Sequence, residues 1–290
     1  MSFKSEFLIL KGFENRSNNI LRCFQPNSSL NDDKIITNSK IHVHFLGDCQ
    51  RLKDSDFYNG KYSCLKSYCI ENIGENLAKR FPGTEIMVVQ PTNFVDSRSI
   101  YSNFVKMTTE PMSIPHYSFT FDCFLHFQTL ILNFYKQINK QENTDEKIKV
   151  SISGFSSGGI VLNQMIYSLK TVILSDRRIK ITDWYFLDIG SCLMHGNYLL
   201  SKNIIEPIQS EKEENVTVNI GSTDFQTSYK GNPSYLKEQE LFEETLSMRL
   251  KNVTVKKVHL KANKRVSKEG SVDYLALHFS IHDELFVGRI

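Results

Sequence analysis

The 290-residue sequence is poor in the features that build metal ribbons, disulfide scaffolds and membrane spans. Its six cysteines show no Cys-x-x-Cys pair and no regular spacing, so we expect reduced thiols rather than a zinc ribbon or a disulfide framework. No apolar run approaches the roughly 20 residues that cross a bilayer, so no transmembrane segment is expected. The 35 basic residues nearly balance the 32 acidic residues, and composition therefore gives no reason to expect a nucleic-acid partner.

The composition is that of a folded globular protein. Hydrophobic residues make up 40% of the chain and charged residues 23%, which is enough apolar material for a sizeable core. The length suits one large domain or two small ones, and α/β proteins often reach this size as one unit. We therefore expect a single domain over residues 1–290.

Short β-rich runs alternate with stretches of helical spacing along most of the chain. The helical stretches are 64–80, 121–138, 157–174, 238–250 and 272–290. The β-rich runs are 5–13, 19–26, 41–48, 84–91, 149–155, 181–190, 215–225 and 252–261. Because nearly continuous apolar strands that alternate with helices are typical of buried parallel sheets, the pattern predicts an α/β fold whose mostly parallel central sheet is covered by helices on both faces.

Three segments stand outside this alternation. Residues 1–40 are expected to form an antiparallel edge hairpin followed by a polar connector. Residues 92–118 and 191–214 are candidate lid segments, because connections of that length inside a compact domain usually carry function. The aromatics of the first lid segment suggest an apolar substrate group or packing within the loop; they are Phe94, Tyr101, Phe104 and Tyr117.

The sharpest motif is a G-x-S-x-G sequence formed by Gly154, Ser156 and Gly158. A predicted strand runs into it and a predicted helix runs out, which is the context of a nucleophile elbow. The residues two positions before and after the nucleophile must be small to let backbones pass closely. Of the neighbouring serines Ser156 and Ser157, only Ser156 meets that rule. A glycine-rich turn of a nucleotide-binding fold is the alternative, but neither G-x-G-x-x-G nor a P-loop pattern is present.

A serine nucleophile needs a histidine base. In folds built on a nucleophile elbow, the base comes last in the chain, after the serine and the acid. We favour His278, because it follows the last strand by a loop and opens the final amphipathic stretch. His282, one helical turn later, is the alternative base, although we expect it to face away from the elbow or to stabilise the helix. His195 comes too early for the usual order, and His259 lies inside a strand.

The carboxylate that orients the base should follow a strand between the serine and the histidine. Asp224 and Asp188 both meet this condition. Asp224 is preferred, because it follows the penultimate strand, and the acid more often lies after that strand in folds with a nucleophile elbow. Each carboxylate could instead cap the next helix or turn.

Two backbone N–H groups should stabilise the oxyanion, one from Ser157 and one from the loop after the third strand. Gly47 or Asp48 is the candidate in that loop. The Asp48 side chain is hard to justify beside a developing negative charge, so we expect it to point away and fasten the loop.

His42 and His44 form an H-x-H pair that could suggest a metal site, but no second ligand cluster supports one, and a buried, hydrogen-bonded strand face is expected instead.

The sequences HFLGDCQ, GFSSGGIVLNQMIYSL and LALHFSI together resemble the eukaryotic family named after human chromosome 2 open reading frame 69, from about residue 41 to the end. The resemblance implies an α/β-hydrolase-like fold, a mitochondrial location and serine hydrolase activity on a substrate that is not established. It maps the elbow to Ser156, the GDxQ turn to Gly47 and Asp48, and the histidine to His278. Ser157 departs from the family, in which a basic residue often stands at that position.

The residues and the resemblance together predict a single α/β-hydrolase-like domain. We expect Ser156, Asp224 and His278 to cleave an ester, thioester or amide of a small-molecule or lipid acyl substrate through an acyl-enzyme, with no cofactor and no metal. The location is mitochondrial by resemblance; a cytoplasmic one is the alternative, because acidic residues weaken the N-terminal import signal. The alternative function is a catalytically inactive hydrolase-fold protein with a binding or regulatory role, and a Rossmann-type nucleotide binder is the third.

Overall fold

The central element of the molecule is a twisted sheet of eight strands. The computed structural model describes residues 3–26, 40–106, 117–118, 121–139, 147–169, 178–189, 208, 215–228, 233–250, 252–262 and 274–290. The strand order is β1-β2-β4-β3-β7-β8-β9-β10, and the six strands from β4 to β10 are parallel neighbours. The strands are β1 (Lys4–Lys11), β2 (Ser17–Phe24), β3 (Lys40–Phe45), β4 (Glu85–Val89), β7 (Ile148–Phe155), β8 (Ile179–Leu187), β9 (Val216–Thr223) and β10 (Val253–Leu260).

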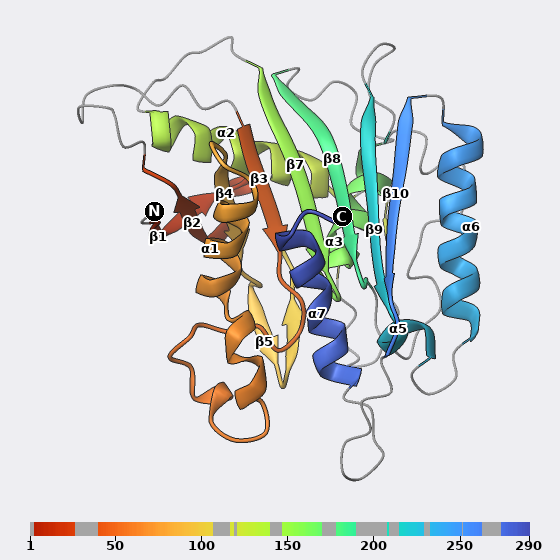
Figure 1. The fold of residues 1–290 in the computed structure, drawn as a ribbon. Helices are drawn as coiled ribbons and strands as arrows, with labels where there is room; N and C mark the ends of the chain where they lie inside the picture. Colours follow the sequence, from red (N-terminus) through yellow and green to blue (C-terminus); the bar gives the residue numbers. More distant parts are fainter. Residues whose placement is uncertain are drawn as a thin grey trace.

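Helices cover both faces of this sheet (Figure 1). One hydrophobic core contains residues of α2 (Cys123–Asn139), α3 (Gly158–Leu169) and α6 (Pro233–Arg249), and a second core contains residues of α1 (Ile70–Arg80) and α7 (Tyr274–Phe286). The hairpin of β1 and β2 is antiparallel and joins the edge of the sheet through β4. The architecture is an α/β fold with a mostly parallel sheet covered on both faces, as the alternation of strands and helices predicted.

Side-chain alternation along the strands assigns residues to the two cores. In β3, Val43 and Phe45 belong to the core that contains α2 and α3. His42 and His44 stand between them in the sequence and therefore point to the opposite face, towards the layer of α1 and α7. In β7, Ile152 likewise lies in the first core and Phe155 in the second.

The carboxyl ends of the parallel strands meet at one edge of the sheet, the lower edge in Figure 1. The short helix α5 (Asp224–Ser228), the N-terminal part of α7 and a small hairpin gather there. The hairpin consists of β5 (Asn93–Val95) and β6 (Arg98–Ile100). Ligands of open α/β sheets bind at this edge, so these elements frame the site.

Two segments differ from the sequence-based expectations. The helix expected over 64–80 is a 3-10 helix (Ser63–Tyr68) followed by α1, because Cys69 is extended and the Ile70 N–H donates to the Arg51 carbonyl. The described part of the first candidate lid contains the β5–β6 hairpin, and its aromatics Tyr101 and Phe104 are buried in the core. The second candidate lid, 191–214, lies outside the described residues except for Ile208.

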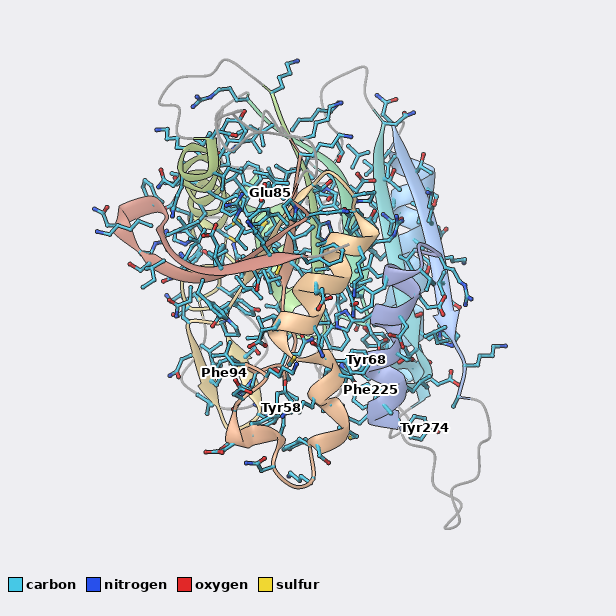
Figure 2. All side chains as sticks on the ribbon, turned by 60° about the vertical axis from the view of Figure 1, so that its left-hand side comes forward. Tyr58, Tyr68, Glu85, Phe94, Phe225 and Tyr274 are labelled. Carbon is cyan, nitrogen blue, oxygen red and sulfur yellow. The ribbon has the colours of Figure 1, made fainter. Side chains whose placement is uncertain are left out.

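The N-terminal hairpin is tied to β4 by a buried ion pair. The Arg22 guanidinium donates to Glu85 at 2.8 Å and to the more exposed Glu6 at 2.6 Å. Glu85, labelled in Figure 2, is only 2% exposed. A charge at this depth depends on its partner, because removing one member of a buried pair leaves the other without compensation.

We expect Glu85→Gln to lower the free energy of unfolding by about 2–3 kcal/mol, because the Arg22 charge would keep only its exposed partner. The matched control is Glu75→Gln, which breaks a 3.0 Å pair with Lys79 in which both side chains are about half exposed. That change should cost less than about 0.5 kcal/mol. Urea unfolding of the three proteins measures both values, and equal losses would contradict the burial argument.

Candidate active site at the carboxyl edge of the sheet

Ser156 occupies the turn between β7 and α3. Its φ of +50° lies in the left-handed region that non-glycine residues rarely adopt, and its N–H donates to the Leu187 carbonyl at 3.0 Å. The side-chain oxygen makes no hydrogen bond within the described part of the chain and is not fully buried. The strained turn therefore presents a free hydroxyl at the carboxyl edge of the sheet, as a nucleophile elbow requires.

The glycines of the motif are needed for close backbone passage. A Cβ at Gly158 would lie 2.3 Å from the Phe45 carbonyl oxygen, and one at Gly154 would lie 2.7 Å from the Gly158 oxygen. Both contacts are with backbone atoms, which cannot rotate away. The steric reason for the G-x-S-x-G spacing is thus visible in the packing of β3, β7 and α3.

His278, on α7, is held by a buried carboxylate from the end of β8. Its Nδ1 lies 2.5 Å from Asp188 Oδ2, and both side chains are almost fully buried. The ring lies between Phe155 and Phe225, with ring centroids 4.5 and 4.3 Å away. The opposite nitrogen, Nε2, has no hydrogen-bond partner among the described residues and is not fully buried. The ring is therefore fixed on one side and free on the other.

Asp188 is itself anchored by β9. Its Oδ1 accepts from the Thr223 N–H at 2.8 Å, and its Oδ2 accepts from the Thr223 hydroxyl at 2.6 Å. Like Ser156, Asp188 has a left-handed backbone, with φ of +44°. The carboxylate thus accepts from three donors when the His278 Nδ1 carries its proton. Because these bonds fix the orientation of the carboxylate, they also restrict the orientation of the imidazole ring.

Ser156 and His278 lie at the same edge of the sheet without a direct hydrogen bond. The Ser156 N–H binds the carbonyl of Leu187, the residue directly before Asp188. The ring of Phe155, the residue directly before Ser156, contacts the His278 ring. Hydrogen bonds between nucleophile and base are often long when no substrate is bound, so this arrangement is compatible with proton transfer.

The structure corrects the sequence-based preference for Asp224. Asp224 begins α5, and its carboxylate lies 3.0 Å from His259 Nε2 and accepts from the Ala262 N–H at 2.8 Å. His259 Nδ1 in turn lies 2.9 Å from the Ser222 hydroxyl, which makes a second Ser–His–Asp array. Ser222 is fully buried and also accepts from Gln239, so its hydroxyl is closed to a substrate. This array joins β9, β10 and α5.

The oxyanion loop after β3 also differs from one expectation. The Gly47 N–H donates to the Gln50 side chain at 2.7 Å and is therefore occupied. The N–H groups of Asp48 and Ser157 have no acceptor within the described part of the chain. Gly47 is still required sterically, because a Cβ there would lie 2.5 Å from the Phe155 ring and 2.9 Å from Ser156 Cβ.

The Asp48 side chain fastens the loop, as expected, but it does not point away from the elbow. Its Oδ1 accepts from the Ser157 hydroxyl and from the Ser99 N–H, both at 2.8 Å. Burial raises the pKa of Asp48, while these two hydrogen bonds and the charges of His278 and Arg98 oppose that rise.

The β5–β6 hairpin braces the same loop. The Ser97 carbonyl accepts from the Cys49 N–H at 2.8 Å, and the Ser99 hydroxyl donates to the Gly47 carbonyl at 2.7 Å. Arg51 stacks 3.4 Å over the Phe94 ring, which lies at the same end of the molecule as Tyr58 in Figure 2. This hairpin was not expected from the sequence, although two short β-type runs around Asp96-Ser97 are a hairpin signal.

The H-x-H pair lies on a buried, hydrogen-bonded strand face, as predicted. His42 contacts the hydroxyls of Ser151 and Ser153 at 2.7 and 2.8 Å, and His44 contacts Ser153 at 2.7 Å. The ring of His282 lies 5.4 Å from that of His44 and is fully buried. The described residues contain no group of three or more His, Cys, Asp or Glu side chains that could hold a metal ion.

His282 packs into the core rather than facing away from the elbow, since its ring centroid lies 4.3 Å from that of Phe155. Its Nε2 is 3.4 Å from the Gln50 amide, and it has no carboxylate partner among the described residues. The contacts therefore favour His278 as the base.

His195 lies outside the described residues. Within the described helices, none combines the length and apolar character needed to cross a membrane.

A protein-family model and a curated relative match this chain. The C2orf69 family model matches residues 7–153 and 136–252. The mitochondrial protein C2orf69 homolog of Danio rerio is 26% identical over an alignment of 153 residues, and the match covers 48% of this chain and 44% of that relative. The match thus spans less than half the length of the curated relative.

The BES protein of Bacillus cereus shares the fold at low sequence identity. It aligns with a TM-score of 0.51 and 13% identity over 99% of this chain and 95% of that chain. At that identity the similarity concerns the fold alone. The S-formylglutathione hydrolase FrmB of Staphylococcus aureus aligns with a TM-score of 0.47 and 11% identity over 98% of each chain.

The buried histidines make the stability of the protein depend on pH. Burial lowers the pKa of His44 to about 3 and lowers the pKa values of His42 and His282 well below 6.5. The unfolded chain therefore binds more protons than the folded protein below pH 6.5. The free energy of unfolding should fall by about 1 kcal/mol per pH unit for each of these histidines as pH drops from 6.5 to 5.

Urea unfolding at pH 7.5, 6.5, 5.5 and 5.0 measures this slope. His44→Gln should reduce the slope by the contribution of one histidine, about 1 kcal/mol per pH unit. A wild-type stability that stays constant from pH 7.5 to 5.0 would contradict the burial of neutral imidazoles.

Proposed function

Because the chain belongs to the C2orf69 family and has an α/β-hydrolase-like fold, we propose that it is a serine hydrolase that cleaves an ester, thioester or amide bond. The observation that carries the proposal is the 2.5 Å contact of His278 with Asp188 at the sheet edge that also holds Ser156, whose hydroxyl makes no hydrogen bond within the described part of the chain and whose backbone is left-handed. The proposed catalytic residues are Ser156, His278 and Asp188, and the proposed oxyanion donors are the N–H groups of Ser157 and Asp48.

In the first half of the reaction, Ser156 Oγ attacks the carbonyl carbon while His278 Nε2 accepts the hydroxyl proton. The imidazolium that forms is stabilised by Asp188, which holds the Nδ1 proton. The carbonyl oxygen becomes an oxyanion and accepts from the two free N–H groups. When the tetrahedral intermediate collapses, the bond to the leaving group breaks, the leaving group takes the proton from Nε2, and the acyl group remains on Ser156.

In the second half, a water molecule repeats the attack on the acyl-enzyme. His278 accepts a proton from the water, the oxyanion forms in the same place, and the ester bond to Ser156 breaks as its oxygen regains a proton. The acid product then leaves. These steps use only side chains and backbone groups of this chain and water.

The substrate proposal is a small-molecule or lipid acyl compound. Phe225, which is partly exposed, borders the His278 ring and provides apolar surface at the reacting centre. We also propose a mitochondrial location, since the Danio rerio relative is named a mitochondrial protein.

A fluorophosphonate probe, which reacts with activated serines, should label the wild-type protein and fail to label Ser156→Ala. Ser157→Ala is the matched control, because it keeps the backbone N–H and removes only the neighbouring hydroxyl; it should still be labelled. Gel fluorescence after labelling measures this. Absence of label on folded wild-type protein would instead favour the catalytically inactive binding protein.

Two carboxylate variants separate the two Asp–His pairs. Asp188→Asn should lower kcat by roughly 10³–10⁴-fold, because the amide would stabilise the wrong tautomer of the base. Asp224→Asn should leave kcat within about threefold of the wild type, because its histidine is paired with a buried serine. Steady-state hydrolysis of a p-nitrophenyl ester, with thermal unfolding as the folding control, measures both. A large loss in Asp224→Asn alone would restore the sequence-based assignment.

A further inference from the structure

Of the two carboxylate oxygens of Asp48, only Oδ1 makes hydrogen bonds within the described part of the protein. Oδ1 accepts both hydrogen bonds that fasten the loop, from Ser157 and Ser99. Oδ2 makes no hydrogen bond within the described part of the chain and is not fully buried. An asparagine could make both fastening bonds through its carbonyl oxygen, so fastening alone explains neither the second oxygen nor the charge.

This oxygen lies close to the proposed reacting centre. Its carboxylate is bonded to Ser157, the residue after the nucleophile and a proposed oxyanion donor. The backbone N–H of Asp48 is the other proposed donor. The charge of His278 acts on Asp48 from across the site. A negative charge here would oppose the negative charge that develops on the substrate oxygen.

The described part of the protein does not neutralise this charge by direct pairing. No Lys or Arg nitrogen of the described residues lies within 4.0 Å of Asp48, although His278 and Arg98 act on it from farther away. A cationic group on the substrate would compensate the carboxylate and the developing oxyanion together. A substrate carboxylate in the same place would be repelled by both.

We propose that Asp48 is a specificity-determining residue that recognises a cationic group, such as a protonated amine, on the acyl part of the substrate. The inference rests on the serine hydrolase function proposed above and adds a substrate class to it. The site then favours cationic acyl compounds over neutral ones of the same shape, and neutral ones over anionic ones.

The test compares three p-nitrophenyl esters. The 4-(trimethylammonio)butanoate is cationic, the 5,5-dimethylhexanoate is its neutral isostere, and the monoester of adipate is anionic. We expect the wild-type kcat/KM to be at least about tenfold higher for the cationic ester than for its isostere, and about tenfold lower for the anionic ester. Asp48→Asn, which keeps both fastening bonds and the backbone N–H, should bring both ratios to within about threefold of unity. The control Asp224→Asn should keep the wild-type ratios.

The outcomes separate this inference from the proposed function. If the wild type hydrolyses the neutral ester but all three esters react alike, or if Asp48→Asn keeps the wild-type ratios, Asp48 recognises no cation and only this inference is overturned. If no ester reacts and the fluorophosphonate does not label Ser156, the function falls and this inference falls with it. Should Asp48→Asn not fold, the wild type still decides, because equal kcat/KM values for the cationic ester and its neutral isostere overturn the proposal.

Discussion

The contact between Asp188 and His278 joins the end of a central strand to the last helix of the chain, and the rest of the site is arranged around it. The carboxylate is held by Thr223 from the next strand, and the imidazole lies between Phe155 and Phe225. Because these partners come from β7, β8, β9, α5 and α7, the orientation of one ring depends on the register of three strands. A buried pair of this kind also restricts how α7 can pack against the sheet.

The described part of the protein contains two Asp–His pairs at the same edge of the sheet, and residue type alone does not distinguish them. The pair of Asp224 and His259 leads to a serine that is fully buried and hydrogen-bonded to Gln239. The pair of Asp188 and His278 leaves an imidazole nitrogen free beside a serine in a strained turn. Access of the hydroxyl, rather than the presence of three residue types, is why we propose acyl transfer at the second pair and a role in joining strands for the first.

The loop after β3 shows how far such a site depends on elements distant in the sequence. Gln50 occupies the Gly47 N–H, and the β5–β6 hairpin binds the loop through Ser97 and Ser99. These bonds leave the Asp48 N–H free and place its carboxylate against Ser157. A loop held from both sides can present backbone donors in a constant position, which is the requirement for stabilising an oxyanion.

The succession of most strands and helices, the tight turn at Ser156 and the inward face of His42 and His44 could be predicted from the sequence. Each follows from a local rule, either a side-chain period or the steric need for glycine at Gly154 and Gly158. The contact of His278 with Asp188 rather than with Asp224, and the hydrogen bond from the Gly47 N–H to Gln50, depend instead on how distant segments pack. Both aspartates end adjacent parallel strands, so their distance to the base is set by how α7 crosses the sheet, and no local pattern encodes that crossing.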